Sequence, residues 1–296
     1  MTGWGRTAVG TLGAFAVAGH VRRARQRARR AAAEVRAAAV DRAVTAARLS
    51  GLSGEPSVVV VMAALNEAES VGDVLDSLPR RVAGLPLRAV VVDDGSTDKT
   101  ARIAADRGAV VASHSRNLGQ GDGLRTGFAV ALALGASVVV TMDADGQHDA
   151  ADLAALVGPV VEGSADYVQG SRFLGRYDDA GSARDVGIRG FTALINALSG
   201  TSVTDCTNGY RAVRASGLAR TRLVEGRFSA AEIIIEAAAC RLRILEVPVH
   251  IRRRAVGESR KPRGLGYPVG FLGAILRSWA RTKGRSWDRV FHRHAQ

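Results

Sequence analysis

Cysteine and aromatic residues are both scarce in this sequence. Its 296 residues contain two cysteines, Cys206 and Cys240, whose spacing forms neither a metal-binding pattern nor a disulfide framework. That usage fits a protein of the reducing cytosol. Aromatic residues amount to 5% of the chain, which leaves few side chains on which nucleic-acid bases could stack. Nucleic acid is therefore not an expected partner.

Long apolar runs are also missing. The 15 residues between Arg6 and Arg22 carry no charge and are rich in Gly, Ala and Thr. A helix that crosses a bilayer needs about 20 consecutive apolar residues, so this stretch is too short to predict a transmembrane span. Its composition also resembles the apolar core of a signal peptide.

Positive charge is abundant, but only at the two ends. The net charge of +13 divides into +7 for residues 1–55, −4 for residues 56–250 and +10 for residues 251–296. A mildly acidic body with basic ends suits attachment to an anionic surface better than it suits a basic binding cleft. We therefore predict a basic, helical N-terminal extension (1–55), a central domain (56–262) and a basic, amphipathic C-terminal helix (263–296).

Both ends leave two interpretations open. Residues 21–49 predict a basic helix that is either a solvated arm or a helix on a membrane surface. In the C-terminal helix, apolar side chains recur on one face, which either packs on the central domain or lies on an anionic leaflet. Those side chains are Tyr267, Phe271, Leu272, Ile275, Leu276 and Trp279. We expect peripheral attachment to a membrane.

Four apolar runs without polar alternation organise the central domain, at residues 57–64, 88–93, 109–113 and 137–143. Helical patterns separate them. Asn66 is a good N-cap for a first helix that ends near Leu78, Gly108 closes a second helix, and a third lies near 121–135. Unbroken β-branched runs between helices predict an α/β fold, with a mostly parallel sheet and helices on both faces.

Acidic and polar side chains follow three of these runs, where each strand is expected to end. They are Asn66 with Glu67, the segment DDGSTD at 93–98, and the segment DADGQHD at 143–149. One such segment alone would be interpreted as a helix cap or a turn. Because ligands of parallel α/β sheets bind outside the carboxyl ends of the strands, three of them predict one shared crevice.

The last segment has the oxygen donors of a metal site. On an extended chain, Asp143, Asp145 and Gln147 would lie on the same side and present three oxygens to one point. Hard donors of this kind suit Mg²⁺ or Mn²⁺, and a metal held by two carboxylates suits a diphosphate leaving group. His148 is a further candidate ligand, but we expect it either to orient its neighbours or to lie exposed on the surface.

Cationic side chains are expected near a diphosphate, and arginine binds phosphate oxygens with two parallel hydrogen bonds. The candidates are Arg172, at the end of a predicted strand, and Arg254 and Arg260, on either side of a Gly-Glu-Ser turn. The glycine-rich loop at 116–127 lacks the spacing of a dinucleotide-binding motif, and we expect it to shape the same crevice.

Together these motifs resemble those of family 2 glycosyltransferases, which have the Rossmann-like GT-A fold. They are ALNEAES, VVVDDGSTD, RNLGQG, MDADGQH, QGSRF, DCTNGYR, LEVPV and RxxGxSR. Over about residues 57–262 the chain is similar to the dolichol- and polyprenol-phosphate mannose synthase branch. The resemblance implies an inverting transfer of a hexose from a nucleotide-sugar donor (GDP-mannose or a UDP-sugar) to a polyprenyl phosphate. It also implies Mg²⁺ or Mn²⁺ as cofactor and a place on the cytosolic face of the cell membrane.

The resemblance also assigns roles by motif position. The nucleoside would be held by Ala63, Leu65, Glu67, Val92 and Asp94, with Asp94 facing the base. The ribose and phosphate region would contact Asp143 and Ala144, and the metal would bind Asp143, Asp145 and Gln147. Asp145, Arg172 and Arg254 would be catalytic. The phosphates of donor and acceptor would contact Arg172, Arg184, Arg254 and Arg260.

The acceptor motif departs from the family pattern. Arg184 is retained, but Ile188 and Thr192 occupy positions that are polar in the family, so a serine that would contact an acceptor phosphate is missing. One alternative is therefore a transferase with a hydroxyl acceptor, which needs a general base such as Asp205 or Glu232. An alternative of another class is a non-catalytic basic protein that binds membranes or nucleic acid.

Overall fold

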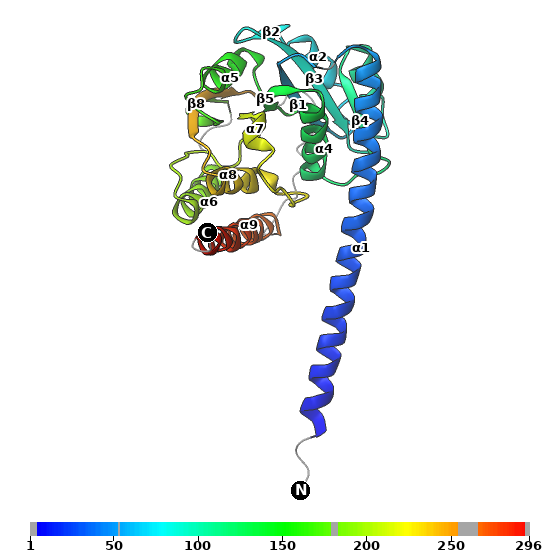
Figure 1. The fold of residues 1–296 in the computed structure, drawn as a ribbon, viewed down its shortest axis with the longest axis vertical. Coiled ribbons are helices and arrows are strands. Elements are labelled where there is room, and N and C mark those ends of the chain that lie inside the picture. The colour runs from blue at the N-terminus through cyan, green and yellow to red at the C-terminus, as the bar shows by residue number, and fades with distance from the viewer. Residues whose placement is uncertain (1–4, 53, 179–182, 254–265, 294–296) are drawn as a thin grey trace.

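The computed structural model describes residues 5–52, 54–178, 183–253 and 266–293. Side chains are described from residue 23 to residue 283, apart from residues 25, 53, 179–184 and 254–265. A mixed sheet forms the centre, and helices cover both of its faces (Figure 1). The strands are β1 (Ser57–Ala64), β2 (Arg81–Val82), β3 (Leu85–Asp93), β4 (Val110–Ser113), β5 (Ala136–Thr141), β6 (Tyr167–Tyr177), β7 (Arg211–Arg214) and β8 (Ile244–Ile251).

The helices fill the intervals and extend the chain at both ends. They are α1 (Gly5–Leu49), α2 (Val71–Asp76), α3 (Thr100–Asp106), α4 (Gln120–Ala133), α5 (Leu153–Val161), α6 (Ala183–Ser199), α7 (Ala215–Leu218), α8 (Ser229–Ala239) and α9 (Gly266–Arg293), with a short 3₁₀ helix at Ala150–Asp152.

The sheet is mostly parallel, as predicted. Its strand order is β2-β3-β1-β5-β7-β6-β8, and β4 also pairs with β3. The pairs β1–β3, β1–β5, β3–β4 and β6–β8 are parallel, whereas β7 runs antiparallel to both β5 and β6. Ala64 stands opposite Asp93, and Val61 stands opposite Thr141. The carboxyl ends of β1, β3 and β5 therefore lie at one edge.

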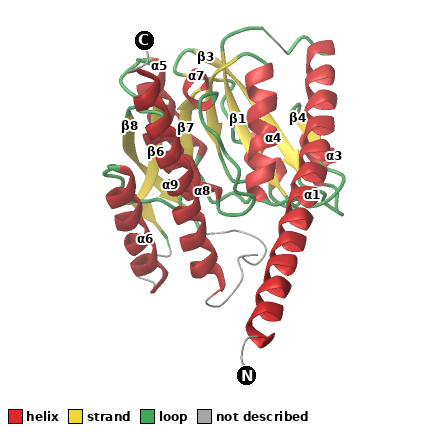
Figure 2. Ribbon diagram, turned by 60° about the horizontal axis from the view of Figure 1, so that its bottom comes forward, coloured by secondary structure: helices red, strands yellow, loops and turns green. Residues whose placement is uncertain are grey.

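Each face of the sheet has its own core. Val59 and Val61 of β1 pack in one cluster with side chains of α1, α4, α8 and α9, whereas Val58 and Val60 pack in the other with side chains of α2, α3 and α5. Figure 2 shows α4 and α8 in front of the strands. Burial of a strand on both faces favours apolar residues at every position, which explains why the runs in the sequence do not alternate.

The N-terminal helix packs on the domain with only part of its length. Ala39, Ala43 and Ala47, each four residues apart, are buried against α4 and β4 together with Val44. The interpretation of residues 21–49 as a solvated arm is therefore wrong for this part of α1. The rest of the helix extends away from the domain (Figure 1). Among the described residues, no helix combines the length and apolar character that crossing a membrane requires.

The C-terminal helix presents two different apolar surfaces. Phe271, Ala274 and Ile275 are buried against the domain, where α9 packs on α6 and α8. Leu272 and Leu276 are 38% and 46% exposed. The predicted single apolar face is thus divided between the core and the surface. The predicted domain boundaries, at residues 55 and 262, remain predictions.

Two local predictions are corrected. Helix α2 begins at Val71 after Ser70, five residues beyond the predicted N-cap. Asn66 instead adopts a positive φ of 49°, and its side-chain oxygen accepts a hydrogen bond from the backbone N–H of Thr97 at 2.7 Å. The helix predicted near 121–135 is confirmed as α4, so the glycine-rich loop expected at 116–127 ends earlier, and Gly121 and Gly123 lie in the helix.

Candidate functional site

Side chains and backbone groups link the three strand-end segments directly. The N–H of Asn66 donates to Ser96 Oγ at 2.9 Å, which joins the first segment to the second. Ser70 Oγ donates to the carbonyl oxygen of Ala144 at 2.8 Å, which joins the first segment to the third. The convergence that the sequence predicted is therefore confirmed, and the three segments form one wall at the carboxyl edge of the sheet.

Asp94 ties the glycine-rich segment to this wall. Its carboxylate accepts hydrogen bonds from the N–H groups of Leu118 at 2.9 Å and Gly119 at 2.7 Å. The ring of His114, which is buried, lies 2.7 Å from the same carboxylate through Nδ1 and 2.8 Å from Thr126 Oγ1 through Nε2. Asp94 thus holds the loop in place. Its predicted contact with the base remains a prediction, and sequence reasoning missed His114, although it directly follows a strand.

Glycine at position 121 is required by a close approach of two backbones. The N–H of Gly121 donates to the carbonyl oxygen of Gly226 at 2.8 Å. A methyl group on Gly121 would lie 2.1 Å from the carbonyl oxygen of Glu225. Rotation of a side chain cannot relieve that contact, because the methyl carbon is fixed to the backbone of residue 121 and the oxygen belongs to the backbone of Glu225.

We therefore expect Gly121→Ala to lower the unfolding free energy by about 1–3 kcal/mol, the usual cost of overpacking, and to weaken nucleotide binding. Thermal melting and nucleotide titration measure the two effects. Gly190→Ala is the matched control, since nothing lies within 4 Å of its added methyl group. If the two variants had the same unfolding free energy and the same nucleotide affinity, the close approach of residues 121 and 225 would be contradicted.

His148 orients Asp143, as predicted. Its Nδ1 accepts a hydrogen bond from the backbone N–H of Asp143 at 3.0 Å, so its Nε2 carries the proton and donates to Asn208 Oδ1 at 3.1 Å. The ring stacks on Tyr210 with centroids 4.6 Å apart. Burial lowers the pKa of His148, although the carboxylates of Asp143 and Asp145 act in the opposite direction. The neutral imidazole, which is held by Asn208 and Tyr210, therefore fixes the start of the acidic segment.

The acidic segment itself is not extended. The chain turns at Ala144–Gly146, where Gly146 has a positive φ of 77°, so the predicted extended geometry of Asp143, Asp145 and Gln147 is wrong. The Asp143 side chain is 38% exposed, and its carboxylate accepts from Gln120 Nε2 at 3.2 Å. The amide nitrogen of Gln147 donates to the carbonyl oxygen of Arg252 at 3.1 Å, which leaves its oxygen as a donor atom for a metal.

These groups fit a metal that the substrate helps to hold. Within the part of the chain that the structure describes, no three His, Cys, Asp or Glu side chains gather closely enough to bind a metal by themselves. Mg²⁺ and Mn²⁺ sites that act on phosphates commonly use only one or two carboxylates and complete their octahedron with phosphate oxygens and water. Asp143 and Asp145 would supply such a pair, although Asp145 Oδ1 already accepts a hydrogen bond from the backbone N–H of Gln147 at 3.1 Å.

Not every residue predicted to hold the nucleoside presents a side chain there. Val92 is fully buried in one core and Ala144 is 3% exposed in the other, so neither residue presents appreciable surface to a donor, and their predicted contacts remain predictions. Ala63, Leu65 and Glu67 are partly exposed at the end of β1. Of these, Glu67 accepts from Ser70 Oγ at 3.2 Å.

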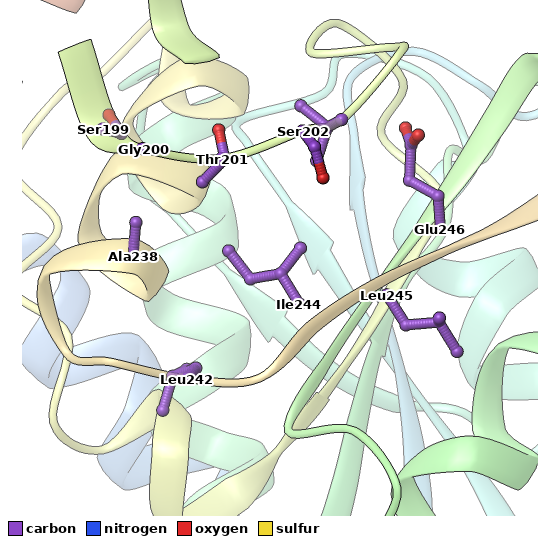
Figure 3. Close-up of a pocket in the computed structure, with 10 residues that line it drawn as sticks. Ser199, Gly200, Thr201, Ser202, Ala238, Leu242, Ile244, Leu245 and Glu246 are labelled. Atoms are coloured by element: carbon purple, nitrogen blue, oxygen red, sulfur yellow. The ribbon is translucent and has the colours of Figure 1, made fainter. Parts of the chain in front are cut away.

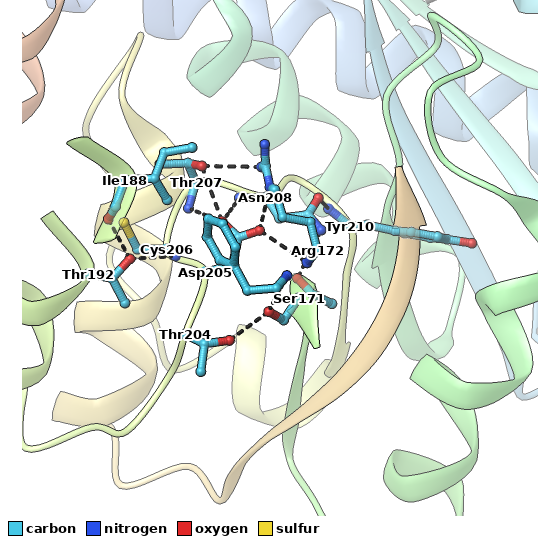
Figure 4. Close-up of polar contacts among 12 residues, drawn as sticks. Ser171, Arg172, Ile188, Thr192, Thr204, Asp205, Cys206, Thr207, Asn208 and Tyr210 are labelled. Atoms are coloured by element: carbon cyan, nitrogen blue, oxygen red, sulfur yellow. Dashed lines mark hydrogen bonds and ion pairs between the residues drawn. The ribbon is translucent and has the colours of Figure 1, made fainter. Parts of the chain in front are cut away.

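Arg172 lies in a buried ion pair (Figure 4). Its Nε donates to Asp205 Oδ2 at 2.6 Å, and its Nη2 donates to Thr207 Oγ1 at 3.2 Å. Asp205 is fully buried and also accepts from the N–H groups of Thr207 and Asn208. The charge of Arg172 is thus already paired before any phosphate arrives, which the sequence did not predict.

The positions that depart from the family pattern face inward. Ile188 and Thr192 are buried, and Thr192 Oγ1 donates to the carbonyl oxygen of Ile188 at 2.8 Å. The same hydroxyl accepts from the N–H of Cys206 at 3.2 Å. Thr192 therefore supports the 203–208 segment. Arg184 is the second residue of α6, but its side chain lies outside the described residues, as do Arg254 and Arg260.

Neither carboxylate named as a general base is available. Asp205 is committed to Arg172, and Glu232 is fully buried. Glu232 accepts from the N–H groups of Val224 and Glu225, each at 2.9 Å, and pairs with Arg281. Burial raises the pKa of Glu232 against the effect of these donors. Neither side chain is placed to take a proton from a bound hydroxyl.

A separate pocket of about 440 Å³ opens between the end of α6 and the start of β8 (Figure 3). Ser199, Thr201, Ser202 and Glu246 contribute its polar side chains, and none of the residues predicted for the donor lines it. Glu246, which is half-buried, accepts from the N–H of Thr204 at 2.7 Å, and partial loss of solvent raises its pKa. Through Glu246, the wall of this pocket holds the backbone at Thr204. The pocket is not part of the strand-end site.

Comparison with known proteins identifies relatives of this chain. A family model described as glycosyl transferase family 2 matches residues 59–221. A UDP-N-acetylglucosamine–dolichyl-phosphate N-acetylglucosaminyltransferase of Methanococcus voltae is 29% identical over 72% of this chain and 92% of its own length. An undecaprenyl-phosphate mannosyltransferase of Micrococcus luteus is 31% identical over 70% of this chain and 88% of its own length.

Solved structures share the fold. Glucosyl-3-phosphoglycerate synthase from Mycobacterium tuberculosis, crystallised with Mn²⁺, UDP-glucose and phosphoglyceric acid, superposes with a TM-score of 0.59 at 23% identity. The match covers 77% of this chain and 80% of that one. The GT-A type of fold expected from the motifs is confirmed. Because the family model spans more than half of the sequence, this chain belongs to glycosyl transferase family 2 and is a glycosyltransferase.

Proposed function

We propose that this protein transfers a hexose, with inversion, from a UDP- or GDP-sugar to a polyprenyl phosphate at the cytosolic face of the cell membrane. The donor would lie against the wall formed by the ends of β1, β3 and β5, with its diphosphate beside Asp143 and Asp145. Two relatives that match about 70% of the chain are named for transfer to dolichyl or undecaprenyl phosphate. Membership of the family sets aside the alternative of a non-catalytic basic protein.

One observation favours a phosphate acceptor over a hydroxyl. A hydroxyl must lose a proton to a general base as it attacks, and both carboxylates considered for that task, Asp205 and Glu232, are fully buried and bound to arginines. A phosphate is already an anion and needs no base.

The reaction then requires little proton transfer from the protein. An oxygen of the acceptor phosphate attacks the anomeric carbon, the bond from that carbon to the nucleoside diphosphate breaks, and the diphosphate leaves with the bonding electrons. Asp143, Asp145 and the side-chain oxygen of Gln147 would hold Mg²⁺ or Mn²⁺, which would neutralise charge on the leaving diphosphate. His148 keeps Asp143 in place, and Asp94 keeps the glycine-rich segment against the donor.

The proposed function is tested by incubating the protein with Mn²⁺ and a panel of UDP- and GDP-hexoses, with and without polyprenyl phosphate. We expect nucleoside diphosphate release that depends on the lipid, and labelled sugar in the organic phase. Release that is independent of the lipid, with sugar found on a soluble hydroxyl compound, would support the alternative acceptor instead.

The surface of α9 supports attachment to the membrane. Val269, Leu272 and Leu276 are exposed at spacings of three and four residues, and α9 contacts α6, on which Val186 is 74% exposed. Figure 1 shows α6 and α9 at the end of the domain past which α1 extends. Exposed apolar side chains on helices at one end of a basic protein suit an anionic leaflet.

We expect the double variant Leu272→Ser, Leu276→Ser to bind vesicles of phosphatidylcholine and phosphatidylglycerol about tenfold more weakly, since each leucine loses apolar area that would enter the interface. Co-sedimentation measures the change. Val161→Ser, at a residue that is 40% exposed on α5, is the control and should bind as the unchanged protein does. Unchanged binding by the leucine variant would exclude this surface.

A further inference from the structure

Glu232 is a buried carboxylate that the proposed reaction does not use. Its two oxygens accept the N–H groups of Val224 and Glu225 at 2.9 Å each, and one of them pairs with Arg281 of α9. A carboxylate in such a place is costly unless donors surround it. The donors here come from one loop, residues 222–226, and from the C-terminal helix. Glu232 therefore holds that loop and that helix together.

The same loop is held to α9 by a second carboxylate. Glu225 accepts from Arg277 Nη2 at 2.8 Å and lies 3.4 Å from Arg281 Nη1. Arg281 thus contacts both Glu225 and Glu232, and its side chain is only 28% exposed. The 222–226 loop is accordingly fixed between α8 and α9 by charged groups, not by apolar packing alone.

On its other side, the loop touches the segment that forms the donor wall. The N–H of Gly121 donates to the carbonyl oxygen of Gly226 at 2.8 Å. Position 119 is equally tight, since a methyl group on Gly119 would lie 2.7 Å from the same oxygen. A displacement of Gly226 must therefore move residues 119–121.

Residues 118–120 in turn contact the two acidic segments of the candidate site. Asp94 accepts from Leu118 and Gly119, and Gln120 Nε2 donates to Asp143 Oδ1 at 3.2 Å. A continuous series of hydrogen bonds and backbone contacts thus runs from Arg281 through Glu232, the 222–226 loop and the glycine-rich segment to Asp143. Each contact in it is short enough to transmit a shift of position.

We propose that Arg281 and Glu232 are positioning residues for the donor nucleotide: their ion pair makes the C-terminal helix part of the donor site, although neither side chain reaches the donor. The inference rests on the proposed function, in that the ligand is a nucleoside diphosphate sugar. It gives α9 a task in donor binding, separate from any contact with lipid.

The test compares the full-length protein with Arg281→Met, Glu232→Gln and the double variant, by titrating UDP and GDP in the presence of Mn²⁺ and by thermal melting. We expect each single variant to bind the nucleotide about tenfold more weakly, within the range by which mutations along a network between two sites change their coupling. The double variant removes the unpaired buried charge, so its melting temperature should recover while its nucleotide affinity stays low. A purely structural role would restore both together.

Two further variants complete the design. Arg281→Lys keeps the charge and should fold and bind with an affinity between those of Arg281→Met and the unchanged protein. Lys283→Met removes a positive charge from the same helix, where the ammonium group lies 4.4 Å from the centre of the Trp279 ring, and should leave nucleotide affinity unchanged. If Arg281→Met and Arg281→Lys folded and bound the nucleotide as tightly as the unchanged protein, the inference would be overturned and the proposed function would stand. Failure of the unchanged protein to bind either nucleotide would overturn the proposed function, and the inference with it.

Discussion

Asp145→Asn is expected to abolish sugar transfer. The substitution keeps the size of the side chain and removes the negative charge that the metal requires. Loss of a residue that only supports a metal ligand already costs about 10–100-fold, so loss of a ligand should exceed about 100-fold. Nucleoside diphosphate release, measured over a range of Mn²⁺ concentrations, gives the size of the effect.

Asp106→Asn is the matched control for this change. Asp106 lies on α3 with 60% of its side chain exposed and pairs with Arg102 at 3.8 Å, so the same substitution there should leave turnover unaltered. If Asp145→Asn retained a rate close to that of the control at every metal concentration, the two-carboxylate site would be wrong.

Asp205→Asn is expected to destabilise the fold. It leaves the guanidinium of Arg172, which is 7% exposed, without its counter-charge, and breaking one side of a buried ion pair costs about 3–5 kcal/mol. For a domain of this size that corresponds to a fall in melting temperature of about 10 °C. Calorimetry or far-ultraviolet circular dichroism measures it.

This result also separates the two acceptor classes. A general base in contact with substrate would, when replaced by its amide, leave the melting temperature almost unchanged and remove activity. Asp106→Asn is again the control and should change the melting temperature little, because exposed ion pairs contribute at most about 1 kcal/mol to stability. An Asp205→Asn variant as stable as the control, yet inactive only with hydroxyl acceptors, would restore the alternative reading.

The sheet and the convergence of its strand ends could be predicted from local patterns. Runs such as SVVVVMAA at 57–64 fill both faces of a strand, and parallel strands with helical crossovers must end at the same edge. The sites at Asp94 and Asp143 therefore came together as expected, because their positions depend only on where β3 and β5 end.

Conformation inside the turns was less predictable. The acidic segment bends at Gly146, and Asn66 takes a left-handed conformation in place of capping a helix. Both errors have one cause: a polar residue after a strand can hydrogen-bond locally in several backbone conformations. Which one is adopted depends on partners such as Thr97, which lies thirty-one positions away.

Pairing between distant charges could not be predicted at all. Arg172 and Asp205 are 33 positions apart, and Arg281 and Glu232 are 49 apart. Nothing in either local motif distinguishes an arginine that awaits a phosphate from one already bound to a carboxylate. By contrast, the packing of α1 had a local signal that was overlooked, since Ala39, Ala43 and Ala47 repeat at four-residue spacing and mark a narrow contact face.

The metal dependence of nucleotide binding tests directly whether Asp143 and Asp145 hold a metal for the donor. Calorimetric titration of UDP and GDP would be made with Mn²⁺, and again with the metal removed by a chelator. Our account predicts that one of the two nucleotides binds only when Mn²⁺ is present, and that Asp145→Asn loses this metal-dependent binding while Asp106→Asn retains it. Equal affinity with and without the metal, or metal-dependent binding that survives in Asp145→Asn, would contradict it.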